Sequence, residues 1–156
     1  MTRIEPFDRA RHGDGPASVI EGVYREFGFT WEPDGYHADV VSPESHYVAP
    51  AAFFDVAVTD GAVVGTVGGE ATDGVAELKR LYLDRRFRGT GVGRALLERF
   101  VAWARSAGCR RAILWSDKRF VDAHRLYAKL GFATVGDRIC PGDPDRSDEW
   151  GCALDL

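Results

Sequence analysis

Hydrophobic and polar positions follow two different periodicities along this chain, and each periodicity predicts one kind of secondary structure. Three segments carry apolar residues three or four positions apart, the spacing of one helix face: Asp14–Phe27, Arg94–Ala107 and Phe120–Leu130. Each is followed directly by a glycine, the residue that most often ends a helix. We expect Asp14 or Ser18 to cap the first helix. Asp117 or Ser116 is the corresponding cap of the last.

Shorter apolar runs without internal proline predict seven strands. They are Thr2–Phe7, Phe53–Thr59, Ala62–Ala71, Val75–Leu83, Arg111–Ser116, Phe132–Ile139 and Trp150–Leu156. Two-residue turns at Asp60-Gly61 and Asp73-Gly74 join the second, third and fourth strands as antiparallel neighbours. The fully apolar run Ala112–Trp115 is typical of a strand buried in a parallel pair.

The segment from Phe29 to Pro50 follows neither periodicity, because prolines interrupt it and aromatic residues are scattered through it. We expect a long connection with one short helix near Asp39, and long connections in compact domains are often functional. Its aromatic residues either line a binding site or fill the edge of the core, and the sequence leaves both open.

Together these elements predict a mixed α/β fold in one domain over residues 1–156. A central, mostly antiparallel sheet of six or seven strands would be flanked by about four helices. A chain of 156 residues has room for one core, and its composition of 45% hydrophobic and 28% charged residues is that of a soluble globular protein. No apolar run approaches the length of a membrane span and no secretion signal opens the chain, which favours the cytoplasm and no membrane partner.

Charge and cysteine content narrow the function further. The net charge of −4 argues against nonspecific nucleic-acid binding. Three cysteines without a paired metal spacing are read as free thiols, and no histidine has a partner at metal-ligand spacing, so we expect no metal site.

The stretch from Glu77 to Gly93 organises the chemistry, because a predicted strand runs through a glycine-rich turn into a helix. The first turn of such a helix has free N–H groups and partial positive charge, and glycines let a phosphate approach the backbone. Basic residues near the turn, opposed only by Asp84, also suit a polyanionic cofactor. They are Lys79, Arg80, Arg85, Arg86, Arg88 and Arg94.

The details of the turn argue against two common phosphate ligands. It ends Gly93-Arg94-Ala95, without the Lys-Ser/Thr of a nucleoside-triphosphate loop. Counted from Gly89, a dinucleotide fingerprint needs glycine where Arg94 stands, which disfavours a dinucleotide-dependent reductase.

The Arg-x-x-Gly-x-Gly spacing of Arg88–Gly93 resembles the acyl-coenzyme A loop of the Gcn5-related N-acetyltransferase (GNAT) family. The strand Glu77–Leu83 before it and the segment Leu126–Phe132 after it are similar to the neighbouring motifs of that family, in the same order. Three ordered motifs over the C-terminal half of the chain are far more specific than a glycine loop alone.

The resemblance assigns one set of residues to binding acetyl-CoA. They are Leu81, Leu83, Arg88, Gly89, Gly91, Gly93 and Arg94. It implies that the loop amides hold the pyrophosphate, while Leu81 and Leu83 offer unpaired backbone groups to the pantetheine arm. The Leu81 amide is also implied as a donor to the carbonyl oxygen.

The same resemblance implies two catalytic residues. Glu77 lies eleven residues before Arg88, where histone-type members carry a general base, and Glu70 is the reserve. Tyr127 matches the tyrosine that many members direct at the cofactor sulfur as a general acid. The alternative for Glu77 is a strand-edge glutamate paired with a nearby Lys or Arg. The alternative for Tyr127 is an aromatic residue of the core.

We therefore expect an N-acetyltransferase that moves an acetyl or short acyl group from acetyl-CoA to a primary amine, by direct attack in a ternary complex. A coenzyme A-binding sensor without turnover is the alternative. The acceptor would be a small-molecule or peptide amine, and the acidic loop Cys140–Glu149, with Asp34 and Asp39, would attract a cationic one. Dimers are common in the family, so a homodimer is a further expectation.

Overall fold

The computed structural model describes all 156 residues and contains one seven-stranded sheet in the order β1-β2-β3-β4-β5-β7-β6. The strands are β1 (Thr2–Pro6), β2 (Ala52–Thr59), β3 (Ala62–Thr72), β4 (Val75–Leu83), β5 (Arg111–Asp117), β6 (Ala133–Ile139) and β7 (Asp148–Asp155). Every pair of neighbours is antiparallel except β4 and β5, which run parallel. The predicted mixed, mostly antiparallel sheet is confirmed.

The structure has six helices where about four were expected. They are α1 (Arg9–His12), α2 (Gly15–Phe27), α3 (Ala38–Val41), α4 (Pro43–His46), α5 (Val92–Ser106) and α6 (Val121–Lys129), with a 3₁₀ turn at Arg85–Phe87. Three of the six, α1, α3 and α4, are single turns of four residues. A single turn is too short to show helical periodicity, which is why the sequence indicated only one of them.

The expected helix caps were wrong in their chemistry. Asp14 stands at the N-cap of α2, but its side chain makes no capping hydrogen bond, because it instead forms an ion pair with Arg9. The N-cap of α6 is Phe120, and the Asp117 carboxylate accepts hydrogen bonds from the Arg119 backbone and side chain. The helix ends at Gly28 and Gly108 have the left-handed backbone that favours glycine.

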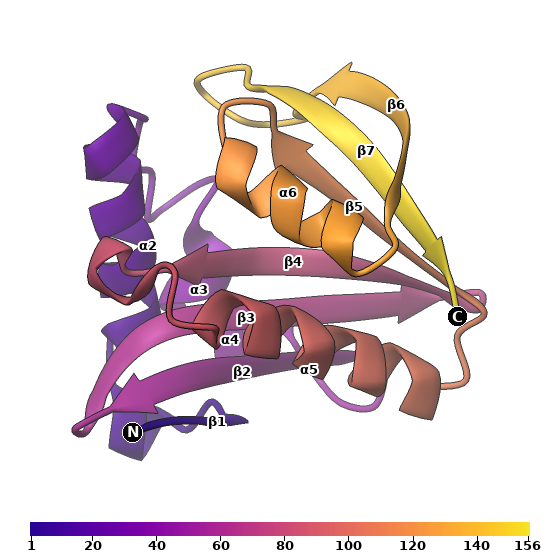
Figure 1. Cartoon of the computed structure of the whole chain (residues 1–156). Coiled ribbons are helices and arrows are strands. Elements are labelled where there is room, and N and C mark those ends of the chain that lie inside the picture. The colour runs from indigo at the N-terminus through magenta and orange to yellow at the C-terminus, as the bar shows by residue number, and fades with distance from the viewer.

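The sheet separates two layers of helices (Figure 1): α5 and α6 cover one face, and α2, α3 and α4 cover the other. The larger core lies on the α5 face and contains the fully buried Leu96, Leu97 and Phe100. The smaller core lies on the α2 face, around Ile20 and Tyr24 of α2 and Val56 of β2. Burial of these apolar stripes fixes which face of the sheet each helix covers.

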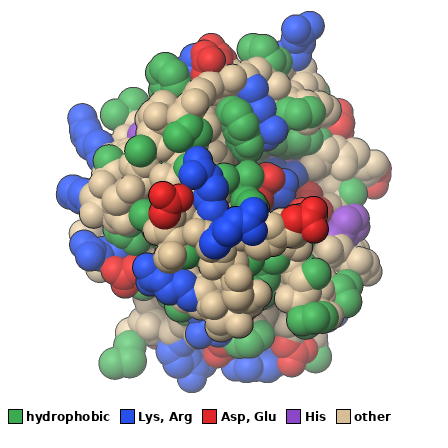
Figure 2. Space-filling view, turned by 90° about the vertical axis from the view of Figure 1, so that its right-hand side faces the viewer, with side chains coloured by type: hydrophobic (Ala, Val, Ile, Leu, Met, Phe, Trp, Pro, Cys, Tyr) green, Lys and Arg blue, Asp and Glu red, His purple; other side chains and the backbone are tan.

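β4 and β5 are paired at one end only. The register joins Val75–Glu77 to Arg111–Ile113, and no residue of β4 beyond Glu77 has a partner on β5. Figure 2 faces the paired end of the sheet, where basic and acidic side chains are interspersed; one ion pair there joins Arg111 to Asp155 at 3.2 Å. The diverging ends lie on the opposite side of the molecule.

Candidate active site

The candidate site begins where β4 and β5 diverge. β5 remains paired with β7 as far as Asp117, so it is β4 whose outer edge loses a neighbour after Glu77. Asp84 donates its amide to the Val64 carbonyl, and Tyr82 is paired with Thr66, so the backbone groups of both residues face β3. Because backbone direction alternates along a strand, those of Leu81 and Leu83 face the side that β5 has left.

A loop with free backbone donors follows the end of β4. None of the amides from Gly89 to Arg94 donates to a protein acceptor, and the first hydrogen bond of α5 runs from the Ala95 amide to the Gly91 carbonyl. Gly89 and Gly91 have φ angles of 74° and 92°, and a Cβ on either would meet no atom within 4 Å. Six consecutive free N–H groups at the positive end of a helix, with open space beside them, form an anion-binding site.

The basic side chains around this loop are less available than the sequence indicated. Carboxylates other than Asp84 oppose them: Arg88 pairs with Glu26, Arg94 with Glu98 and Arg80 with Asp39. The expectation of a cluster opposed only by Asp84 is therefore wrong, because Glu26 and Asp39 come from segments far away in sequence. Arg85 alone of the cluster has no ion pair, and the backbone amides are the other free donors, so the residues present fit the diphosphate and amide-rich arm of coenzyme A.

Glu77 lies on the face of the sheet opposite α5. Its neighbours Ala76 and Leu78 belong to the core on the α5 face, so alternation directs Glu77 to the other face. Its carboxylate is 2.6 Å from the Lys79 ammonium, its side chain is 29% exposed, and Glu70 is its cross-strand partner on β3. The ion pair anticipated for a purely structural glutamate is thus present, but the carboxylate still reaches solvent.

Tyr127 lies on α6, on the opposite face of the sheet from Glu77. It is 4% exposed and packs in the larger core, with the Phe132 ring centroid 6.2 Å from its own. Burial raises the pKa of Tyr127, and the Ser116 hydroxyl opposes that rise only in part. The tyrosine therefore keeps its proton at neutral pH. Glu77 and Tyr127 therefore lie on opposite faces of the sheet, and Glu77 is the last residue of β4 paired with β5.

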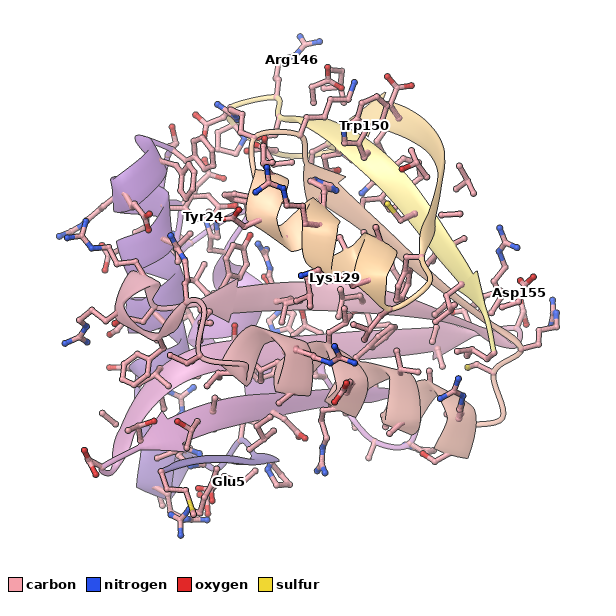
Figure 3. All side chains as sticks on the ribbon, viewed as in Figure 1. Glu5, Tyr24, Lys129, Arg146, Trp150 and Asp155 are labelled. Carbon is pink, nitrogen blue, oxygen red and sulfur yellow. The ribbon has the colours of Figure 1, made fainter.

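Three further side chains lie near the opening, of which the sequence indicated Arg80 only as part of a basic cluster and Glu149 only as part of an acidic loop. Arg80 of β4 is held by Asp39 of α3. Glu149 of β7 is buried beside Arg138, and burial raises the pKa of its carboxyl although the Arg138 guanidinium opposes the rise. Tyr24 projects from α2 toward the interior (Figure 3), with its hydroxyl 3.5 Å from that of Tyr82. No local pattern indicates that these residues lie at the site, since each is brought there by contacts distant in sequence.

The sequence profile of the acetyltransferase (GNAT) family matches residues 17–132, which is most of the chain and includes the parted strand, the glycine loop and α6. The chain belongs to the GNAT acetyltransferase family. The family resemblance inferred from the three motifs is confirmed.

Individual GNAT relatives differ in how much of their length this chain covers. The N-acetylaspartate synthetase of Rattus norvegicus is 39% identical over 103 residues, which are 64% of this chain and 34% of that protein. The IAA acetyltransferase of Azospirillum brasilense is 33% identical over 123 residues, 73% of this chain and 80% of that protein. The aminoglycoside N(6')-acetyltransferase type 1 of Stenotrophomonas maltophilia is 38% identical over 95 residues, 54% and 61% of the two chains. The chain spans about a third of the length of the N-acetylaspartate synthetases it matches.

Solved GNAT structures share the fold over the whole chain. An acetyltransferase from Streptococcus agalactiae superposes with a TM-score of 0.86 at 22% identity, covering 99% of this chain and 98% of that one. An acetyltransferase from Salmonella typhimurium, solved with its cofactor acetyl-CoA, gives 0.75 at 20% identity and covers 100% and 94%. At these identities the likeness concerns the fold alone.

No three histidine, cysteine or acidic side chains are grouped as they would be around a metal ion. None of the helices combines the length and the apolar character needed to cross a membrane.

Proposed function

We propose that this GNAT chain transfers an acetyl group from acetyl-CoA to an amine. One observation carries the proposal: β4 loses its neighbour at the same end of the sheet at which the free amides of Gly89–Arg94 lie. The amides are suited to a diphosphate and the unpaired edge of β4 to an extended arm with amide groups of its own. Acetyl-CoA has both, and it supplies the activated thioester.

The residues of the chain take separate roles in this proposal. The Leu83 amide and the Leu81 backbone would align the pantetheine arm along β4, since the Leu83 carbonyl already accepts from Arg88. The Leu81 amide would donate to the carbonyl oxygen as negative charge develops there. The amine would enter from the face that bears Glu77, opposite the face that α5 and α6 cover. Holding donor and acceptor in one complex supplies much of the rate enhancement by itself.

An amine acceptor must lose a proton before or during its attack. Glu77 is the proposed base, because its partly exposed carboxylate lies on the amine's side of the sheet, where β4 and β5 begin to diverge. The Glu77 carboxylate must separate from the Lys79 ammonium before it accepts the proton of the amine. Glu149 is a second base, since burial raises its carboxyl pKa toward the range useful for proton transfer at neutral pH. Glu70, the reserve, is exposed and faces Glu77 across the strands.

The leaving thiolate is the natural target of an acid. Tyr127 is the proposed donor, since burial keeps its hydroxyl protonated on the face that α5 and α6 cover. Direct attack is favoured over an acyl-cysteine, because all three cysteines are buried, and burial raises the thiol pKa of Cys140 and Cys152. A buried thiol with a raised pKa is a poor nucleophile.

The names of the relatives point to two kinds of acceptor, N-acetylaspartate synthesis in one case and an aminoglycoside in another. Both involve amine nitrogens, so the proposal extends to an amine in general. The decisive experiment measures thiol release from acetyl-CoA with a panel of amino acids, polyamines, aminoglycosides and peptides. Release that depends on one class of amine supports the transferase. Tight acetyl-CoA binding without release from any amine supports the coenzyme A sensor instead.

A further inference from the structure

Arg80 occupies an unusual position on β4, beside the proposed oxyanion donor. The register pairs Tyr82 with Thr66 and Lys79 with Gly68, so Arg80 and Leu81 together oppose the single residue Val67. This is a β-bulge, and Arg80 takes the positive φ of 49° that such a position usually reserves for glycine. The Thr66 hydroxyl donates to the Arg80 carbonyl at 2.7 Å and helps to hold the strained residue.

The bulge directs the Arg80 side chain to the same face as Glu77, where α3 holds it. Its Nε and Nη2 atoms donate to the two carboxylate oxygens of Asp39 at 2.9 and 2.8 Å, and Nη2 also donates to the Tyr36 carbonyl at 2.6 Å. The Tyr36 ring lies against the guanidinium, with its centroid 4.7 Å from Cζ. Asp39 is itself fixed by the Tyr47 hydroxyl at 2.6 Å. The guanidinium therefore has one orientation.

One edge of this guanidinium remains free. Nη1 takes no part in these hydrogen bonds, and 12% of the side chain is exposed. The Tyr82 hydroxyl interacts with the guanidinium, which opposes the rise that burial causes in the pKa of Tyr82. The N–H groups of Nη1 are therefore the donors that remain for a ligand beside the Tyr82 hydroxyl. A planar guanidinium, fixed on two sides and free on the third, is preorganised to bind a carboxylate.

All but Asp34 of the acidic side chains expected to attract a cationic acceptor are paired within the protein. Asp39 binds Arg80, Asp145 binds Thr30, and Glu149 binds Arg138. Asp143 accepts the backbone amides of Asp145 and Ser147, while Asp137 and Asp148 share Lys118. The carboxylates from Asp137 to Glu149 order the loop between β6 and β7, whereas Asp39 orders the Arg80 guanidinium.

We propose that Arg80 binds a carboxylate of the acceptor, so that the acceptor is an amino acid or another amine with a carboxylate a few bonds from its nitrogen. The inference rests on the proposed acetyl transfer and names its substrate class. Arg80 is adjacent in sequence to Leu81, whose amide faces the opening, and Glu77 lies on the same face of the same strand. A carboxylate on Nη1 thus places the amine near both the thioester and the base.

The test compares acceptors that differ only in the carboxylate. Amino acids are paired with their α-amides, such as alanine with alaninamide, and 4-aminobutyrate is paired with butylamine. The value of kcat/KM from thiol release should favour the acid by about tenfold or more in at least one pair, since a charge-assisted hydrogen bond is worth that much. Equal or greater rates for the uncharged member of every pair overturn the inference.

Variants then locate the effect. Arg80→Lys keeps the charge but loses the planar edge, so it should lower kcat/KM for the preferred acid by about 10- to 100-fold and change the uncharged partner by less than about threefold. Arg105→Lys, at an exposed site on α5, is the control. If Arg80→Lys does not fold, the double variant Arg80→Gln/Asp39→Asn, which removes both buried charges together, replaces it. Equal losses for both members of a pair show a purely structural arginine and overturn the inference.

These experiments distinguish a failure of the Arg80 inference from a failure of the proposed acetyl transfer. Thiol release that proceeds only with amines lacking a carboxylate leaves the transferase standing and removes the role of Arg80. Absence of thiol release with any amine removes the transferase and the inference with it.

Discussion

Arg88, the first residue of the glycine-loop motif, forms a bidentate ion pair with Glu26 near the end of α2. Nη1 lies 2.6 Å from Oε2 and Nη2 lies 2.8 Å from Oε1, and Nη2 also donates to the Leu83 carbonyl at 3.3 Å. The side chain thus joins α2 to the end of β4 and to the start of the loop. Arg88 positions the loop amides, which are the phosphate donors of the proposed site.

This arrangement predicts that Glu26→Ala and Arg88→Ala weaken acetyl-CoA binding by similar amounts, about two- to fivefold each, because the pair is about one-third exposed. The double variant should lose little more than either single variant, since both remove the same contact. Isothermal titration with acetyl-CoA measures this cycle, with Glu21→Ala, which removes an exposed pair on the same helix, as control. Additive losses, with Arg88→Ala much the larger, would show that the guanidinium binds the phosphate directly.

The loop hypothesis predicts different results for two neighbouring glycines. Gly91 has a φ of 92°, so an alanine there is strained and its Cβ would enter the open space beside the free amides. At Gly93 a Cβ would meet only Leu83 and Leu126 at ordinary contact distances of 3.7 and 3.8 Å. Gly91→Ala should weaken acetyl-CoA binding by about tenfold or more, and Gly93→Ala by less than about threefold. Circular dichroism controls for folding, and wild-type affinity in the Gly91→Ala variant would remove the loop from the cofactor site.

Much of the fold could be predicted because its signals are local. The strand Val75–Leu83 was predicted with the bounds the structure has, since Asp73-Gly74 marks its start and the apolar run marks its length. The glycine loop and α5 followed from residue types alone. The extent of the domain, the site roles and a homodimer stay predictions.

The rest of the site depends on contacts that no local pattern contains. The bulge at Arg80 is visible only in the register between β3 and β4, where two residues of one strand oppose one of the other. A glycine at this position would have indicated the bulge, but the residue with the positive φ is an arginine. Glu26 and Asp39 are brought to their arginines by α2 and α3, so the sequence suggested free charges where the structure has ion pairs. Backbone donors such as the Leu81 amide have no residue signature and were found by resemblance only.

The burial of His37 leads us to expect that the free energy of unfolding depends on pH. Burial, with the nearby charge of Arg80, lowers the pKa of His37 to about 4. Its ring is fully buried against Trp31 and Tyr24, and Nδ1 accepts the Glu32 amide. Between pH 6.5 and 4 the unfolded chain binds a proton at this histidine that the folded chain does not, so stability falls as the pH falls. The loss from this residue should reach about 3 kcal/mol at pH 4.

Urea unfolding at several pH values measures this effect. His37→Asn, which retains an acceptor for the Glu32 amide, should have a smaller decrease in unfolding free energy between pH 6.5 and 4 than wild type, whatever its stability at pH 7. His46→Gln, at an exposed histidine, should keep the wild-type slope. A His37→Asn variant with an unchanged slope would show that His37 does not resist protonation.

Tyr127→Phe tests the proposed acid. The variant removes one hydroxyl from a buried ring that otherwise packs in the core, so folding should change little. Turnover with acetyl-CoA should fall by about 10- to 100-fold, and by less with an acyl donor whose thiol is more acidic, because such a thiolate needs less protonation to leave. The measurement is kcat for both donors in both proteins. Full activity with both donors would leave Tyr127 as a packing residue.

Glu77→Gln separates the three proposed bases, because it retains size and hydrogen bonding but cannot accept the amine proton. If Glu77 is the base, kcat/KM at neutral pH should fall by about 10²- to 10⁴-fold with little change in acetyl-CoA affinity. The loss should shrink at high pH, where the free amine is already abundant. Glu149→Gln and Glu70→Gln, measured in parallel over the same pH range, provide matched comparisons. Glu149 has the carboxyl with the raised pKa, so if it is the base the acid limb of the wild-type profile should disappear in its variant instead. A Glu77→Gln enzyme with the wild-type profile would exclude Glu77 as base, and the variant that flattens the acid limb would identify the carboxylate that takes the proton.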